Sequence, residues 1–161
     1  MSGTPAERAT APAAVTWSAR IGIAAAAVQV IGLVRWPLVV PSLADRATDA
    51  GASPEARADA ADTFELLGSI LGTGIGETLG YLLTALWTVL VVQAFRDRLA
   101  GRWFAALGLT SAALILSGVA IPLDLPGADF ANFAGYVLWS TWLIAFAVLL
   151  WRRRTVAPKA W

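Results

Sequence analysis

The sequence from Gly68 to Arg98, GSILGTGIGETLGYLLTALWTVLVVQAFRDR, determines the class of this protein. From Gly76 to Phe95 the only formally charged residue is Glu77. A helix needs about 20 consecutive, mostly apolar residues to cross the hydrocarbon core of a bilayer. The stretch therefore predicts a transmembrane helix.

Glycine residues recur at every fourth position in this stretch, at Gly68, Gly72, Gly76 and Gly80. Residues four apart lie on one side of a helix, where the absence of side chains lets a neighbouring helix come close. We expect this stripe to be a helix-packing seam.

Polar side chains at helical spacing follow the glycines: Glu77, Tyr81, Thr84 and Thr88 share one face. Leucine and valine cover much of the remaining circumference, so this polar stripe is expected to contact protein and not lipid. A carboxylate in lipid is costly or becomes protonated, and Glu77 therefore needs a partner, a water-filled cavity or a position close to the headgroups. The hydroxyl groups could line a pathway, but threonine in spans most often bonds within or between helices, which favours packing.

The composition is that of a polytopic membrane protein. Of the 161 residues, 58% are hydrophobic and 14% are charged, which is too apolar for an ordinary soluble domain. The absence of cysteine and histidine, with a single methionine, removes thiol catalysis and the usual ligands of haem, zinc and copper. No nucleophile with a base and no carboxylate pair appears within the membrane. We expect no cofactor, no metal site, no catalytic residues and no enzymatic activity.

The hydrophobic segments divide the chain into an all-α bundle of four transmembrane helices. The spans are expected at about 17–40, 73–95, 103–122 and 130–151 within a transmembrane domain 17–151. Residues 1–16 are rich in Ala, Thr and Pro and are expected to be a disordered cytoplasmic tail. Residues 152–161 form a basic cytoplasmic tail.

The segment between the first two spans is acidic and contains its own helix signal. Ser53, Pro54 and Glu55 are typical of an N-cap, a first helical residue and a first-turn acid. Apolar residues then recur every three or four positions, which predicts an extracytoplasmic amphipathic helix before the second span. This helix either bends within 72–76 or continues straight from Pro54 to Phe95, over about 60 Å. The next exterior connection, 123–129, is expected to be a tight turn because it contains two Asp, one Pro and one Gly.

The distribution of basic residues predicts the topology. Cytoplasmic loops carry an excess of Lys and Arg. Nine basic residues fall on the expected inner side and only two on the outer side. The inner set is Arg8, Arg20, Arg96, Arg98, Arg102, Arg152, Arg153, Arg154 and Lys159, and the outer set is Arg46 and Arg57. We therefore expect a multi-pass protein of the plasma membrane with both termini in the cytoplasm.

Arg35 and Glu77 are charged residues predicted to lie within spans. Arg35 is 15 residues beyond Arg20, about 22 Å by helical rise, and Glu77 reaches a similar depth in the next helix. Intramembrane charges usually pair, so an interhelical charge pair that fixes the register is favoured over a functional site for an ion or small substrate. Both alternatives remain open at the level of the sequence.

Three segments together resemble one family: RWPLVVPSLAD (Arg35 to Asp45), FELLGSILG (Phe64 to Gly72) and IGETLGYLLTALWTVL (Ile75 to Leu90). They resemble a bacterial family of multi-pass membrane proteins catalogued only as a domain of unknown function. Many members have more than four spans and a His after the Glu of the GE motif, where this chain has Thr78. The resemblance implies an integral membrane protein and no activity, and a proton relay through that His does not carry over. The frequent Ala and Arg also resemble actinobacterial usage.

Function follows from the sequence only in outline. The favoured hypothesis is a structural, assembly or regulatory membrane component. The alternative is a small transporter or channel subunit that uses Arg35 and Glu77. The bilayer is the expected environment, with a membrane-protein partner or a second copy of the chain as possible partners. Nucleic-acid binding is not expected, since Arg152 to Arg154 lie next to a span and act first as a topology signal.

Overall fold

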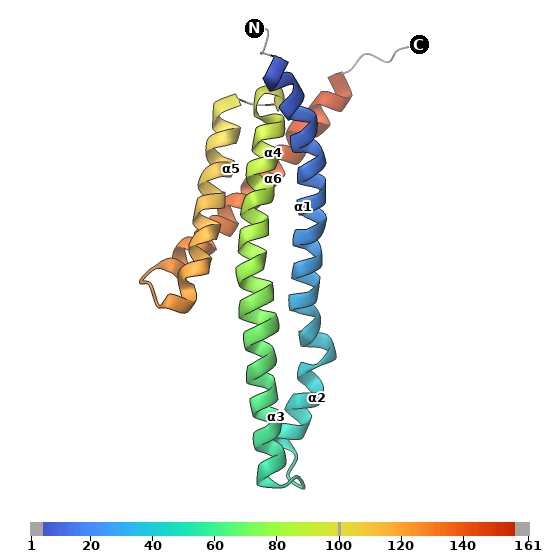
Figure 1. The fold of residues 1–161 in the computed structure, drawn as a ribbon, viewed down its shortest axis with the longest axis vertical. Helices are drawn as coiled ribbons and strands as arrows, with labels where there is room; N and C mark the ends of the chain where they lie inside the picture. Colours follow the sequence, from blue (N-terminus) through green and yellow to red (C-terminus); the bar gives the residue numbers. More distant parts are fainter. Residues whose placement is uncertain (1–4, 100, 157–161) are drawn as a thin grey trace.

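The computed structural model describes residues 5–99 and 101–156, and the described part contains helices and turns but no strand. Four helical segments are long and apolar enough to cross a membrane: Ala13–Thr48, Pro54–Asp97, Gly101–Leu123 and Ala128–Arg153. They run alternately up and down (Figure 1). This arrangement confirms the predicted all-α four-helix membrane bundle.

The first crossing consists of two helices in line. Helix α1, Pro5–Leu38, is followed after one residue by α2, Val40–Thr48, which has Pro41 in its first turn. A proline is tolerated there because the first-turn N–H groups have no intrahelical partner. Helix α2 was not predicted, although Val40, Leu43, Ala44 and Ala47 have the spacing of an apolar helix face.

The second crossing is one uninterrupted rod (Figure 1). Helix α3, Pro54–Leu67, begins at the predicted N-cap, where the Ser53 hydroxyl accepts a hydrogen bond of 3.2 Å from the backbone N–H of Ala56. It continues through η1, Gly68–Leu79, which is a π-helix, into α4, Gly80–Leu99. The chain therefore does not bend at 72–76. The wider π-helical winding takes up the glycine-rich stretch, and the Thr78 hydroxyl bonds the carbonyl of Thr73 five residues earlier, at 2.9 Å.

The third and fourth crossings form a shorter hairpin. Helix α5, Gly101–Leu116, ends in the 3₁₀-helical η2, Ser117–Leu123, and α6, Ala128–Val156, returns. The connection is the predicted tight turn, in which Asp124 and Gly127 adopt positive φ values of 50° and 81°. This hairpin covers only part of the length of the rod, so α2 and α3 project beyond it (Figure 1).

Aromatic side chains form the core between α4, α5 and α6. Phe104 and Trp142 are fully buried, with ring centroids 5.1 Å apart, and the Trp142 indole donates a hydrogen bond of 3.1 Å to the Phe104 carbonyl. Trp87 of α4 meets Trp142 of α6 edge to face at 6.0 Å. On its other side Trp87 packs against Gly22 of α1, where an added methyl group would lie 2.8 Å from the indole nitrogen. Trp87 therefore connects α1 to the rest of the bundle.

The two tails differ from expectation. Residues 5–16 belong to α1 and are helical, because alanine is the strongest helix former and a helix already begun extends at little cost. Similarly, α6 continues through the expected start of the C-terminal tail to Val156. Residues 1–4 and 157–161, which include Lys159, lie outside the described residues.

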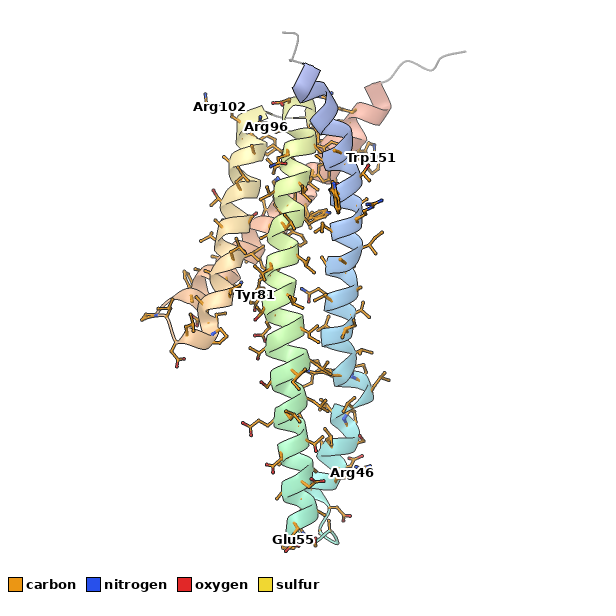
Figure 2. All side chains as sticks on the ribbon, in the orientation of Figure 1. Arg46, Glu55, Tyr81, Arg96, Arg102 and Trp151 are labelled. Atoms are coloured by element: carbon orange, nitrogen blue, oxygen red, sulfur yellow. The ribbon has the colours of Figure 1, made fainter. Side chains whose placement is uncertain are left out.

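Charged side chains separate along the long axis. Figure 2 shows Arg96, Arg102 and Trp151 at one end and Arg46 and Glu55 at the other. We call the first the Arg96 end. We call the second, where α2 and α3 form a hairpin, the hairpin end. The described start of α1 and end of α6 both lie at the Arg96 end (Figure 1).

Candidate functional site

The glycine stripe of the rod faces α1. A methyl group at Gly32 of α1 would lie 2.7 Å from the Cα atom of Gly76, so the two backbones touch. About one turn away on either side, the side-chain amide of Gln29 packs on Gly80, and the guanidinium of Arg35 packs on Gly72. Three of the four predicted glycines therefore form the seam. Gly68 does not, because nothing lies within 4 Å of a methyl group added there.

A cavity of about 460 Å³ opens beside this seam. Its volume is within the range of about 300–1,000 Å³ that is usual for small-molecule sites. We call it the Arg35–Glu77 cavity because it contains both predicted charged residues. It is lined by Gln29, Gly32, Leu33, Arg35, Trp36, Gly72, Gly76, Glu77, Tyr81 and Tyr136.

The two charges share this cavity but do not form an ion pair. The guanidinium of Arg35 packs on the backbone at Gly72 and lies 5.3 Å from the ring centroid of Trp36. Glu77 is exposed, and no guanidinium nitrogen of Arg35 lies within 4.0 Å of its carboxylate. A side chain at position 72 would overlap the guanidinium. The glycine therefore leaves the space in which Arg35 lies against the seam. A direct salt bridge between the two predicted partners is therefore not seen.

The predicted polar stripe divides between two environments. Tyr81 is half-buried and lines the cavity, where its ring lies 6.1 Å from that of Tyr136. Thr84 and Thr88 are buried on the side of the bundle core. The Thr88 hydroxyl donates to the Thr84 carbonyl at 2.8 Å and accepts a hydrogen bond of 2.8 Å from the Trp139 indole. The threonines therefore serve helix packing.

Sequence reasoning missed five residues that line the cavity: Gln29, Gly32, Leu33, Trp36 and Tyr136. Gly32 could have been found as a small residue of the first span that faces the glycine stripe of the second. Tyr136 is on the last helix, and no local pattern relates it to Tyr81. Only the packing of α6 brings the two rings together.

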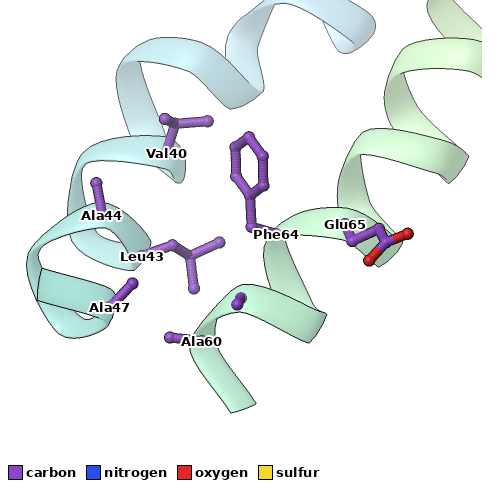
Figure 3. Close-up of a pocket in the computed structure, with 8 residues that line it drawn as sticks. Val40, Leu43, Ala44, Ala47, Ala60, Phe64 and Glu65 are labelled. Carbon is purple, nitrogen blue, oxygen red and sulfur yellow. The ribbon is translucent and has the colours of Figure 1, made fainter. Parts of the chain in front are cut away.

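A second cavity, of about 560 Å³, lies between α2 and α3 (Figure 3). We call it the α2–α3 cavity. Its walls are aliphatic and aromatic side chains with one carboxylate, from Glu65. The lining residues are Val40, Leu43, Ala44, Ala47, Ala60, Ala61, Phe64 and Glu65. The cavity results from the many alanines, which are too small to fill the space between the two helices.

The described residues contain no group of three or more acidic side chains that could hold a metal ion. Asp124 and Asp129, the nearest approach to a carboxylate pair in the sequence, belong to the turn before α6 and its first helical residues. The Arg35–Glu77 cavity itself presents charged groups, hydrogen-bonding groups and aromatic rings for recognition.

A family model described as a domain of unknown function, DUF4386, matches residues 5–155 of the chain. The chain belongs to this DUF4386 family. The match extends beyond the first two spans, which carried the resemblance in the sequence, and includes all four crossings. Searches of curated proteins and of solved structures found no match. The family description names no activity, so a function has to be argued from the geometry.

Proposed function

We propose that this DUF4386 protein is a non-enzymatic structural, assembly or regulatory component of a bacterial plasma membrane, with both termini in the cytoplasm. In this proposal the α2–α3 hairpin, residues 40–67, meets its partner at the outer surface. The partner is another membrane protein or a second copy of the chain, and nucleic acid is not involved.

The proposal rests on the unequal lengths of the first helix pair, from α1 to α4, and the second, from α5 to α6. The paired helices α1–α2 and α3–η1–α4 extend past the turn between η2 and α6 (Figure 1). The extension bears Asp45, Asp49, Asp59 and Asp62, all exposed, and such acidic side chains are not accommodated in hydrocarbon. A helical hairpin held outside the bilayer on two continuous helices is a rigid surface for a partner.

The aromatic packing between α4, α5 and α6, towards the Arg96 end, argues against a conducting pathway through one copy of the chain. Phe104, Trp142 and Phe146 stack with centroid distances of 5.1–5.7 Å, and Trp87 closes the space towards α1. Protein interiors packed in this way have few voids larger than a water molecule. None of these four rings lines the Arg35–Glu77 cavity, so the packed core lies outside it.

Site-specific photocrosslinking in intact cells tests the proposal. A benzophenone amino acid is placed at exposed Asp59 on the α2–α3 hairpin, and at Ile144 as a control, because Ile144 is exposed on α6 within the span. We expect a discrete adduct from position 59 and none from position 144. An adduct of twice the chain mass identifies a second copy, and another mass identifies a partner protein. Adducts at both positions, or at neither, would contradict a specific role of the hairpin.

The second candidate is a small transporter or channel subunit, and the shared cavity of Arg35 and Glu77 favours it. Purified protein in liposomes decides between the two candidates. Flux of an ion that is abolished by Glu77→Gln and retained in Asp62→Asn would establish the second candidate. Tight vesicles with the wild-type protein agree with the first.

A further inference from the structure

The Arg35–Glu77 cavity lies at the height of the lipid headgroups. Glu77 is 19 residues before Arg96 in the same rod, which is about 28 Å by helical rise. The hydrocarbon core is about 30 Å thick, so Glu77 reaches the boundary opposite the Arg96 end. The rings of Trp36, Tyr81 and Tyr136 gather at this cavity, and Trp and Tyr are the residues enriched at membrane interfaces. Tyr81 also packs against Gly118 of η2, close to the end of the shorter hairpin (Figure 2).

Arg35 provides an anion site in the cavity. Its guanidinium contacts the Gly72 backbone and the Trp36 ring, and among the described residues it makes no hydrogen bond and no ion pair. It is partly buried, so the stacking holds it while its donors remain available to the cavity. A guanidinium presents planar paired donors that match the oxygens of a phosphate.

Glu77 adds a cation site to the same cavity. Its carboxylate accepts no hydrogen bond from the described residues and lies more than 4.0 Å from the guanidinium of Arg35. The cavity of about 460 Å³ that both side chains line has room for a small molecule with one charge of each sign. Tyr81 and Tyr136 also line the cavity, and aromatic rings attract cations.

We propose that the cavity binds the zwitterionic headgroup of a phospholipid, with its phosphate on Arg35 and its ammonium on Glu77. Two observations favour a lipid over a soluble zwitterion. Leu33 and Trp36 line the cavity and are 61% and 51% exposed on α1, so the cavity opens towards the bilayer. The acyl chains would continue along the apolar surface of α1, where Val30 is 64% exposed. This inference is independent of the partner proposed for the α2–α3 hairpin.

Native mass spectrometry of the full chain in detergent tests the proposal with two lipids. Phosphatidylethanolamine offers both charges, whereas phosphatidylglycerol offers the phosphate without an ammonium. We expect phosphatidylethanolamine to bind about tenfold more tightly, the effect of one additional charge-assisted hydrogen bond. Glu77→Gln should reduce its affinity to that of phosphatidylglycerol. Arg35→Leu should weaken both lipids, and Arg35→Lys, which keeps the charge, should restore part of the binding.

Matched variants outside the cavity serve as controls. Asp62→Asn and Arg46→Leu remove the same charges from exposed positions at the hairpin end and should leave both affinities unchanged. Equal binding of the two lipids by the wild-type protein, or an unchanged preference in Glu77→Gln, overturns the proposal. Glu77→Gln changes an exposed side chain, so the test does not depend on a variant that fails to fold. Displacement of the lipid by O-phosphoethanolamine at similar concentrations would overturn the lipid as the source of the zwitterion.

Discussion

At the scale of single residues, the contact between Gly32 and Gly76 depends on two missing side chains. The backbones of α1 and η1 touch there: a methyl group at Gly32 would lie 2.7 Å from the Gly76 Cα atom, and one at Gly76 would lie 3.4 Å from the Gly32 Cα atom. A side chain larger than a methyl group at Gly76 would therefore enter α1. Gly68 belongs to the same sequence stripe but faces open space. Gly68 is therefore a control position within the stripe: a substitution there tests the sequence change without the helix contact.

We predict that Gly76→Leu separates α1 from the rod. Overpacking costs about 1–3 kcal/mol or more in a well-packed site, so the free energy of unfolding in detergent should fall by at least this amount. Gly68→Leu, measured in the same thermal unfolding experiment, should change it by less than about 0.5 kcal/mol, as is usual for exposed positions. Equal losses at both positions would show that the whole stripe is buried.

Arg35 and Glu77 allow a second prediction at this scale. Because the structure places their charged groups more than 4.0 Å apart, a double-mutant cycle of Arg35→Leu and Glu77→Gln should be nearly additive in lipid-free detergent. Independent sites add within about 0.3–0.5 kcal/mol. The cycle is read by thermal unfolding. A coupling above about 1 kcal/mol would mean that the two side chains do pair directly, as the sequence alone suggests.

At the scale of secondary-structure elements, α4 and α6 meet through aromatic rings. Trp87 contacts Trp139 at 5.9 Å, and Phe95 contacts Phe146 at 5.4 Å. Large rings hold two helices apart, whereas the glycines between α1 and η1 let the backbones touch. The rod therefore lies close to α1 and farther from α6. The hydrogen bond from Trp139 to Thr88 is a directional contact across the wider interface.

We predict that Thr88→Val destabilises the α4–α6 interface. The substitution preserves shape but leaves the indole N–H of Trp139 without its acceptor, which costs about 1–3 kcal/mol when the group is buried. Thr141→Val is the matched control, because Thr141 also bonds the carbonyl four residues earlier but is exposed. Thermal unfolding in detergent should separate the two variants. Equal effects would indicate that the backbone bond, and not the indole, matters.

At the scale of the whole molecule, two hairpins of unequal length place the acidic extension at one end and the basic residues at the other. The described start of α1, the described end of α6, the end of α4 and the start of α5 share the Arg96 end (Figure 1). The excess of basic residues there is typical of the cytoplasmic side.

We predict that a cysteine at Asp49 reacts with a membrane-impermeant maleimide in intact cells, and that a cysteine at Asp97 reacts only after lysis. Both positions are exposed and the native chain contains no cysteine, so the labels report topology alone. The reverse labelling pattern would show that the protein has the opposite orientation in the membrane. The cavity would then face the inner leaflet, and its lipid preference could be measured as before.

The sequence by itself determined the membrane class, the four crossings and the turn before α6. It also determined the start of α3, because Ser53 and Pro54 form a cap through local hydrogen bonds and fixed backbone angles. Hydrophobic length, capping and turn chemistry act over a few neighbouring residues. Such properties can be read from one segment without knowing where the others lie.

The tertiary structure alone decided which glycines are contacts, where Arg35 and Glu77 point, and that Tyr136 shares a cavity with Tyr81. Residues 29–36, 72–81 and 136 meet only after three helices have packed. The direction of Arg35 illustrates the reason. Sequence spacing gives the height of a side chain along its helix, but its partner depends on the rotation of each helix about its axis. That rotation is set by the close contact of Gly32 with Gly76 and by the aromatic rings on the opposite side of the rod.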